Sequence, residues 1–375
     1  MKPVVEEYIN KIERVIESGR YKDSWESLRG YPAPTWYKNA KFGIFIHWGV
    51  YSVPAYGNEW YPRNMYIEGT AEFAHHIKTW GEHRAFGYKD FIPLFKAERF
   101  DADAWMRLFK EAGARYVMPV AEHHDGFQMY DSAISEFNSA RMGPKFDVLG
   151  KLREAADKEG LAFCLSSHRA ENYFFFAGGR EFDSGIRDMV FEEPYGFAHA
   201  AFSTAKSIDA TSDIYGEPAS EEHLREWLAR GCELVDKYRP KIVWFDWWIQ
   251  NISFKPYLRK FAAYYYNRAI EWGTEVAINY KFDAFMHTTA VFDIERGQVA
   301  NIRPGLWQGE TTIGKRSWGY IEGNEFKDPG DLIRNLADIV SKNGCLLLNI
   351  GPRSDGTITD EEQRTLRAIG GWLKT

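Results

Sequence analysis

The sequence has little cysteine, no long apolar run and no block of charge of one sign. Its 375 residues include only three cysteines, Cys164, Cys232 and Cys345. An odd number of widely spaced cysteines in apolar stretches predicts buried thiols and argues against a disulfide framework. No stretch of 18 consecutive apolar residues occurs, so a membrane-spanning helix is not expected.

Charge is balanced and mixed along the chain. There are 47 basic and 53 acidic residues, a formal net charge of −6. Binding to a phosphate backbone requires a clustered basic face, so no nucleic-acid partner is expected. The N-terminal 20 residues have no cationic start, and Glu6 and Glu7 lie where the apolar core of a signal peptide would begin. These features predict a cytoplasmic protein that does not enter a membrane.

Aromatic residues are abundant: 26 Phe, 21 Tyr and 14 Trp make up 16% of the chain. This exceeds what a core of this size needs, so we expect some of these rings to line a binding surface. Apolar residues, at 45%, suffice for a large core. A chain of this length can form either two domains or one α/β barrel.

Short apolar runs alternate with amphipathic helical patterns, which is typical of parallel strands joined by helices. The predicted strands are 42–47, 116–122, 161–167, 242–246, 275–280 and 345–350. No G-x-G-x-x-G turn follows the first strand, so a closed (β/α)8-like barrel is favoured over a dinucleotide-binding sheet. We expect residues 1–30 to form a helical segment packed on a catalytic barrel of residues 31–375.

Local signals give several helix ends. Asp101 or Asp103 opens one helix, Gly160 closes another, and Thr359 with Glu362 forms a capping box. Residues 170–220 lack periodicity, and a loop of this length in a compact domain is usually functional or disordered. The aromatic run 173–176 predicts an ordered loop over a pocket, because such side chains avoid water.

Polar side chains follow most of the predicted strands. In a parallel barrel the functional groups gather at the carboxyl ends of the strands. Those ends supply the following residues: His47 with Glu59 and Trp60 beyond it, His123 and His124, the turn 167–171 that includes His168, and Asp246 between aromatic residues. Taken singly, His47 fits a core histidine and Asp246 a helix N-cap, but their joint placement favours a site.

Two kinds of chemistry suit such a set: metal-assisted hydrolysis and glycoside hydrolysis by two carboxyl groups. Neighbouring residues of a strand point to opposite faces, so His123 and His124 are poorly placed to chelate one ion, and no H-E-x-x-H or C-x-x-C pattern occurs. A carboxyl pair needs one ionised and one protonated acid. We therefore expect neither a metal nor a cofactor.

Four motifs occur in an order that resembles a known family. They are KFGIFIHWGVYSVPAYGNEWYPRNMY, EHHDGFQMYDS, VWFDWW and the segment from SWGYIEGNEF to LLLNIGPRSDGTI. Together they resemble the family 29 glycoside hydrolases, the α-L-fucosidases, from about Trp36 to the end. The resemblance implies a retaining enzyme on a (β/α)8 barrel that hydrolyses α-L-fucosides through a covalent fucosyl-enzyme.

By its place in the W-F-D motif, Asp246 resembles the family's nucleophile. The family's acid/base lies on a variable loop, and Glu295 stands at a similar distance along the chain. Glu310, in a Trp-Gln-Gly-Glu-Thr segment, and Glu171 at another strand end are the alternatives. Each of the three could equally be a loop carboxylate in a salt bridge.

The resemblance also implies a sugar-binding set. Its members are His47, Glu59, Trp60, His123, His124 and Trp244. Trp318 fits the same wall and fits a core tryptophan equally well. Three features depart from the family pattern. Trp247 replaces a common glycine, and the Ser-His-Arg-Ala-Glu-Asn turn at 167–172 differs from the usual one. Lys281 stands where an arginine is usual and is expected to take over its cationic role in substrate binding, as a point charge instead of a planar group.

Alternatives remain open. An α-L-galactosidase would need the same hydroxyl pattern, and a non-catalytic carbohydrate-binding barrel would keep the aromatic wall without needing the Asp246 carboxylate. The expected partner is a fucosylated oligosaccharide or glycoside. Family members commonly carry a C-terminal β-sandwich, which we do not expect in this sequence, and the flank it would leave uncovered could favour a homo-oligomer.

Overall fold

The computed structural model describes residues 2–186 and 218–375. Its strands pair in parallel, and the sheet closes because β1 (Phe42–Ile46) pairs with both β2 (Tyr116–Glu122) and β9 (Gly344–Ile350). Strands β3 (Ala162–Phe163) and β4 (Leu165–Ser167) both pair with β2 and form one barrel strand. The others are β5 (Ile242–Phe245), β6 (Ala277–Tyr280), β7 (Val291–Glu295) and β8 (Trp307–Thr312). This closed barrel of eight parallel strands confirms the predicted fold class.

The sequence patterns locate six of the eight barrel strands to within three residues but miss β7 and β8. Both carry polar residues that point into the barrel. Asp293 of β7 accepts a hydrogen bond from Gln308 of β8 at 2.7 Å, and Glu310 is fully buried. Apolar periodicity therefore cannot reveal these two strands.

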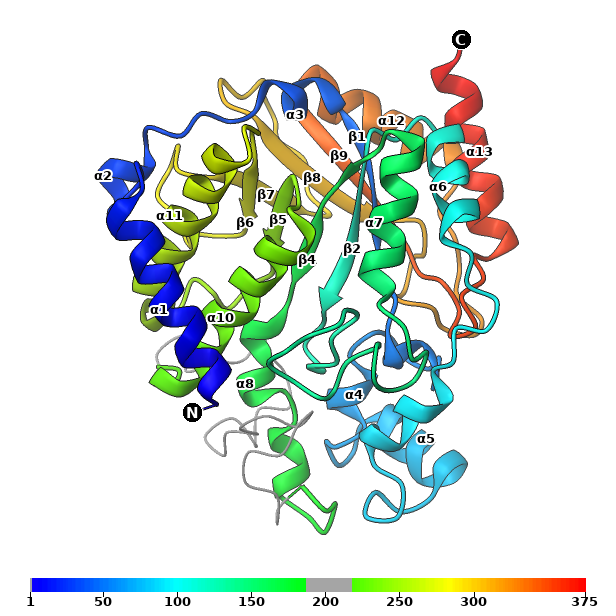
Figure 1. Ribbon diagram of the computed structural model, residues 1–375. Coiled ribbons are helices and arrows are strands. Elements are labelled where there is room, and N and C mark those ends of the chain that lie inside the picture. Colours follow the sequence, from blue (N-terminus) through cyan, green and yellow to red (C-terminus); the bar gives the residue numbers. More distant parts are fainter. Residues whose placement is uncertain (1, 187–217) are drawn as a thin grey trace.

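Helices surround most of the barrel (Figure 1). Between or after strands lie α6 (Ala102–Glu111), α7 (Val148–Glu159), α10 (Glu221–Tyr238), α11 (Lys255–Glu271), α12 (Pro329–Ser341) and α13 (Asp360–Leu373). The connections from β6 to β7 and from β7 to β8, both fully described, contain no helix. A groove of about 740 Å³ lies there, lined by residues of β6 and β7 and by the segment before β1.

Further helices precede β1 or lie around the mouth of the barrel. Helix α1 (Pro3–Ser18) packs across α10 and α11 from outside, followed by α2 (Trp25–Leu28) and α3 (Thr35–Ala40). Helices α4 (Tyr61–Asn64), α5 (Ala71–Trp80) and α8 (Asn172–Phe175) lie at the barrel end toward which the strand arrows point (Figure 1). That end is the carboxyl-terminal face of the sheet.

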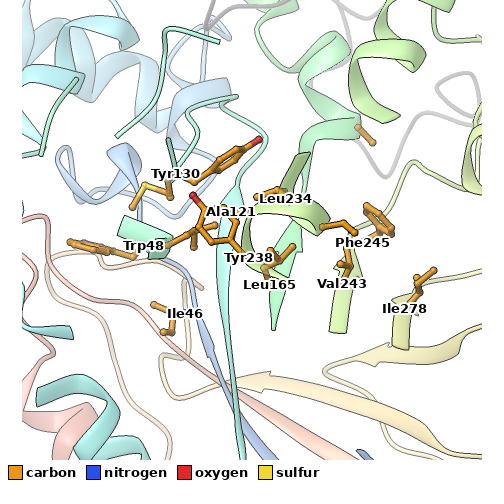
Figure 2. Close-up of a cluster of buried hydrophobic side chains, with 14 of the residues drawn as sticks. Ile46, Trp48, Ala121, Tyr130, Leu165, Leu234, Tyr238, Val243, Phe245 and Ile278 are labelled. Atoms are coloured by element: carbon orange, nitrogen blue, oxygen red, sulfur yellow. The ribbon is translucent and has the colours of Figure 1, made fainter. Parts of the chain in front are cut away.

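The core has two layers. Inside the barrel, Phe45, Met118, Ile242 and Trp244 belong to one buried cluster. Between barrel and helices lies the larger cluster, in which strand residues such as Val243 and Phe245 meet side chains of α10; Figure 2 labels part of it. Successive strand residues thus alternate between the two layers, as the pleat requires.

The helix ends predicted from the sequence are found in the structure. The Asp101 side chain accepts from the Ala104 N–H and caps α6, Gly160 ends α7 in the left-handed conformation, and Thr359 and Glu362 form the capping box of α13. The three cysteines are buried free thiols, as predicted. In the described part of the chain, no helix is long and apolar enough to cross a bilayer.

Two adjacent glycines of α13 allow a matched test of helix packing. A β-carbon at Gly370 would collide with the carbonyl oxygen of Glu111 and lie 2.8 Å from the Ala112 α-carbon of α6, whereas one at Gly371 would meet nothing within 4 Å. We predict that Gly370→Ala lowers the free energy of unfolding by about 1–3 kcal/mol. Gly371→Ala should raise it by up to about 1 kcal/mol. Urea unfolding measures both, and equal shifts would contradict the close packing.

Candidate active site

A cavity of about 140 Å³ opens at the carboxyl ends of the strands. Side chains from β1, β5, β7 and β8 and from the segments after β1, β2, β4, β5, β6 and β8 line it. They are Phe45, His47, Glu59, Trp60, His123, His124, His168, Trp244, Asp246, Trp247, Lys281, Glu295, Glu310 and Trp318. All ten primary site residues predicted from sequence are therefore brought together, along with one of the two alternative acids.

Asp246 lies in the cavity wall, where two donors and the unprotonated Nε2 of His124 surround its carboxylate. Lys281 Nζ lies 2.9 Å from Oδ1, and His168 Nδ1 and His124 Nε2 lie 3.0 and 3.4 Å from Oδ2. Burial alone would raise the pKa of Asp246, but the charge of Lys281 and the contact with His168 outweigh it and hold that pKa well below its usual range. Asp246 is therefore ionised at neutral pH.

Lys281 joins the carboxyl groups of three strands. Its ammonium contacts Glu295 Oε2 at 2.7 Å and Glu310 Oε1 at 3.1 Å in addition to Asp246. Burial would lower the pKa of Lys281, yet the surrounding carboxylates, Asp246 first, raise it well above its ordinary value. The side chain also lies over the Trp244 ring, 4.8 Å from its centroid. One fixed cation thus sets the spacing of the acids.

The three candidate acids differ in exposure. The side chain of Glu295 is 43% exposed, whereas those of Glu310 and Glu171 are 1% and 0% exposed. Burial and the neighbouring Asp293 raise the pKa of Glu310 well above its usual range. Burial and the charge of Asp246 do the same for Glu171, which lies 3.3 Å from His124 Nδ1 behind the cavity wall. Only Glu295 is accessible to a ligand from solvent.

Three histidines of the cavity, His47, His123 and His124, are neutral at neutral pH. Burial is the main cause that lowers the pKa of His47 and His123 well below the usual value and that of His124 to about 3. His47 Nδ1 lies 2.7 Å from Asn349 Oδ1, which fixes this ring as a donor there and leaves its other nitrogen as an acceptor. Neutral imidazoles can both donate to and accept from sugar hydroxyls.

An acid and several rings complete the wall. Glu59 Oε2 accepts from Ser317 Oγ at 3.0 Å and from the Trp318 backbone N–H at 2.8 Å. Trp318 is half-buried with its ring 5.3 Å from that of His47, so it lines the cavity while also packing against the inner core cluster. Trp60 faces His124 on one side and Trp247 on another.

The aromatic run predicted to cover a pocket falls partly on α8. Tyr173 and Phe174–Phe176 are buried, and the Phe175 ring lies 5.3 Å from the rings of both Trp60 and His124. This part of the expected ordered segment does support the cavity wall. The remainder of the predicted loop, residues 187–217, lies outside the described residues.

His168 is a site residue that the sequence-based set of binding residues left out. It follows β4, with Nδ1 facing Asp246 and Nε2 lying 3.0 Å from Ser166 Oγ. A hydroxyl donating to Nε2 leaves the proton on Nδ1, where it can be donated to the carboxylate. Its place at a strand end was the available signal, but the Ser-His-Arg-Ala-Glu-Asn turn departs from the family pattern.

A parallel barrel whose carboxyl-terminal face holds an ionised aspartate, an accessible glutamate and a wall of histidines and tryptophans has the arrangement of a carboxyl-dependent glycoside hydrolase. Comparison with known proteins defines the family. Residues 9–375 match the family model Alpha-L-fucosidase, and the chain belongs to this family of glycoside hydrolases.

Relatives cover nearly the whole chain. Tissue alpha-L-fucosidase of Bos taurus is 31% identical over 363 residues, 94% of this chain and 70% of its own length. Plasma alpha-L-fucosidase of Homo sapiens is 30% identical over 371 residues, 95% of this chain and 70% of its own length. The crystal structure of Thermotoga maritima alpha-fucosidase in complex with fucose superposes with a TM-score of 0.75 at 33% identity, covering 95% of this chain and 77% of that one.

The contact between His168 and Asp246 predicts a kinetic effect. His168→Phe removes the donor to Oδ2 while keeping a ring, and a lost hydrogen bond to a charged group should lower kcat about ten- to a hundredfold. KM for an aryl α-L-fucoside should change much less, since His168 orients the carboxylate. A variant with raised KM and native kcat would instead make His168 a sugar contact. Ser166→Ala, which only loosens the ring, should cost less.

The position of Lys281 predicts a change in pH dependence. Lys281→Gln removes the main charge that lowers the pKa of Asp246, so burial then dominates and that pKa rises. The acid limb of the kcat/KM profile should therefore move to higher pH. Lys281→Arg keeps the positive charge and should leave the limb near its native position. An unshifted limb in Lys281→Gln would mean that Asp246 is not the group titrating there.

Proposed function

We propose that this member of the alpha-L-fucosidase family releases terminal α-L-fucose with retention of anomeric configuration, by double displacement at Asp246 and Glu295. The observation that carries the proposal is the single ammonium of Lys281, which contacts Asp246 Oδ1 and Glu295 Oε2. Those two oxygens cannot be further apart than two hydrogen bonds, under about 6 Å. Retaining enzymes space their carboxyl groups by about 5 to 5.5 Å, and inverting enzymes by more.

Each carboxyl group suits one role. Asp246 is ionised and fixed by two donors, as a nucleophile requires. In the first step Glu295 protonates the glycosidic oxygen while Asp246 attacks the anomeric carbon from the opposite face, forming a fucosyl ester and releasing the aglycone. In the second step Glu295 takes a proton from water, which attacks the anomeric carbon and frees Asp246.

Accessibility supports Glu295 over the two alternatives. A general acid must come within hydrogen-bond distance of the glycosidic oxygen, and the aglycone must reach solvent. Glu310 lies in the barrel interior against Lys281 and Asp293, and Glu171 lies behind His124. We assign both a structural role in the wall around the nucleophile, and we assign proton transfer to the substrate to neither of them.

The remaining lining residues fit a deoxysugar. Neutral His47, His123 and His124 offer donors and acceptors to ring hydroxyls, and Glu59 accepts further hydrogen bonds. Half-buried Trp60 and Trp318 present apolar faces to C–H groups and a methyl group. The two-carboxyl mechanism uses no metal or organic cofactor in any step.

The experiment is hydrolysis of 4-nitrophenyl α-L-fucoside, with the anomer of the first-formed product identified by proton NMR. The native protein should release α-L-fucose first. Asp246→Ala should lower kcat at least about a thousandfold, as expected when a nucleophile is removed. First-formed β-L-fucose would contradict double displacement. The α-L-galactoside, run alongside, tests the alternative sugar.

Glu295→Ala tests the acid/base. Its loss should be severe for fucosides with poor leaving groups and mild in the first step for 4-nitrophenyl, which needs little protonation. Added azide should restore turnover of Glu295→Ala and give fucosyl azide of retained configuration, since an anion needs no general base. Glu310→Gln is the matched control: azide should not restore its activity. Rescue of Glu310→Gln and not of Glu295→Ala would exchange the two assignments.

A further inference from the structure

An arginine follows the proposed acid/base and is held in an unusual backbone conformation. Arg296 is exposed and has φ +47°, in the left-handed region that residues with a β-carbon rarely adopt. Its backbone N–H donates to the carbonyl oxygen of Glu310 at 2.9 Å, which continues the pairing of β7 with β8. The sheet therefore fixes the direction of this side chain, at a cost of about 1–2 kcal/mol in backbone strain.

The guanidinium of Arg296 lies over Trp318, 5.0 Å from the ring centroid. Trp318 lines the sugar cavity, and so does Glu295, the residue directly before Arg296 in the chain. An arginine stacked on an aromatic face keeps its N–H groups directed outward in the guanidinium plane. That geometry leaves a planar, two-pronged donor at the rim of the cavity.

No carboxylate of the described residues forms an ion pair with this charge, although Arg296 is near enough to Glu59 to counter the rise in the pKa of that acid. Across residues 2–186 and 218–375, no carboxylate lies within ion-pair distance of Arg296, nor of Lys327, whose Nζ donates to Thr311 Oγ1 at 2.7 Å. The two cations are close: burial and the charge of Arg296 lower the pKa of Lys327. Neighbouring like charges repel each other, and an anion bound beside both of them would relieve that repulsion.

The position of Arg296 beside Glu295 determines which part of the substrate it would contact. The glycosidic oxygen must reach the Glu295 carboxyl, so the leaving group lies on that side of the cavity, next to residue 296. We infer that the aglycone side of this site is an anion-binding subsite, in which Arg296, with Lys327 beside it, binds a carboxylate or sulfate ester on the sugar or aryl group that carries the fucose. This inference rests on the proposed function, because the role proposed for Glu295 defines which side of the cavity receives the leaving group.

The test compares charged and neutral leaving groups on the same enzyme. kcat/KM is measured for 4-carboxyphenyl α-L-fucoside and its methyl ester, and for 4-sulfooxyphenyl and 4-methoxyphenyl α-L-fucoside. The anionic-to-neutral ratio in the native protein should exceed that in Arg296→Gln by about fivefold, as for a partly exposed charge pair. Differences in the intrinsic reactivity of the leaving groups cancel, because the same ratio is compared between two proteins. The ester and sulfate pairs separate the two anion chemistries.

Two variants and salt serve as controls. Arg296→Lys keeps the charge but loses the fork, so its ratio should lie between those of native and Arg296→Gln. Arg14→Gln, which removes an exposed arginine of α1, should keep the native ratio. Raising NaCl from 0.05 to about 1 M should lower the native ratio, because screening weakens exposed charge pairs. Equal ratios in native and Arg296→Gln would overturn the inference.

A binding measurement separates this inference from the proposed function. If no fucoside is hydrolysed, the proposed function fails while the subsite is still testable by calorimetry. Asp246→Asn binds without turnover, and the doubly substituted Asp246→Asn, Arg296→Gln protein is its reference. Tighter binding of the carboxyphenyl fucoside than of its ester in the first protein alone would support the anion subsite. The same preference in both proteins would contradict it.

Discussion

The buried ammonium of Lys281 is the interaction on which the rest of the site depends. It contacts Asp246, Glu295 and Glu310, which come from the ends of β5, β7 and β8, while Lys281 itself follows β6. Without that charge, three neighbouring carboxyl groups would repel one another and Asp246 would lose its main reason to be ionised in a buried place. The barrel supplies the directions of these side chains, and the lysine makes their proximity energetically acceptable.

The three contacts also show why a lysine suits position 281. A planar guanidinium binds one carboxylate with two parallel hydrogen bonds, whereas an ammonium directs three donors apart. Lys281 uses that freedom to reach three strands at once. The roles proposed for Asp246 and Glu295 agree with their exposure: Asp246 is buried between two donors, and Glu295 is open to solvent on one side.

Much of the fold was predictable, because the apolar runs of β1, β2, β5 and β9 and the cap at Thr359 are local signals. The place of Asp246 followed from its position at a strand end. Strands β7 and β8 could not be found in this way, since their inward residues are polar and serve the site. Chain spacing favoured Glu295, but it could not show that Glu310, paired with it in register on β8, is buried while Glu295 is exposed. The role of His168 could not be predicted from the sequence, because it rests on a contact with Asp246, which lies far along the chain.

The helix-free connections on either side of β7 affect how the molecule responds to heat. Strand β7 carries Glu295, and its outer face borders a groove where other strands have a covering helix. A strand with fewer apolar neighbours opens at a lower free energy than the rest of the sheet. The wall with the proposed proton donor is therefore the first part of the barrel to fluctuate, while the proposed nucleophile, backed by α10 and α11, stays in place. Amide hydrogens of β7 will exchange sooner than those of β5, and thermal inactivation will precede global unfolding.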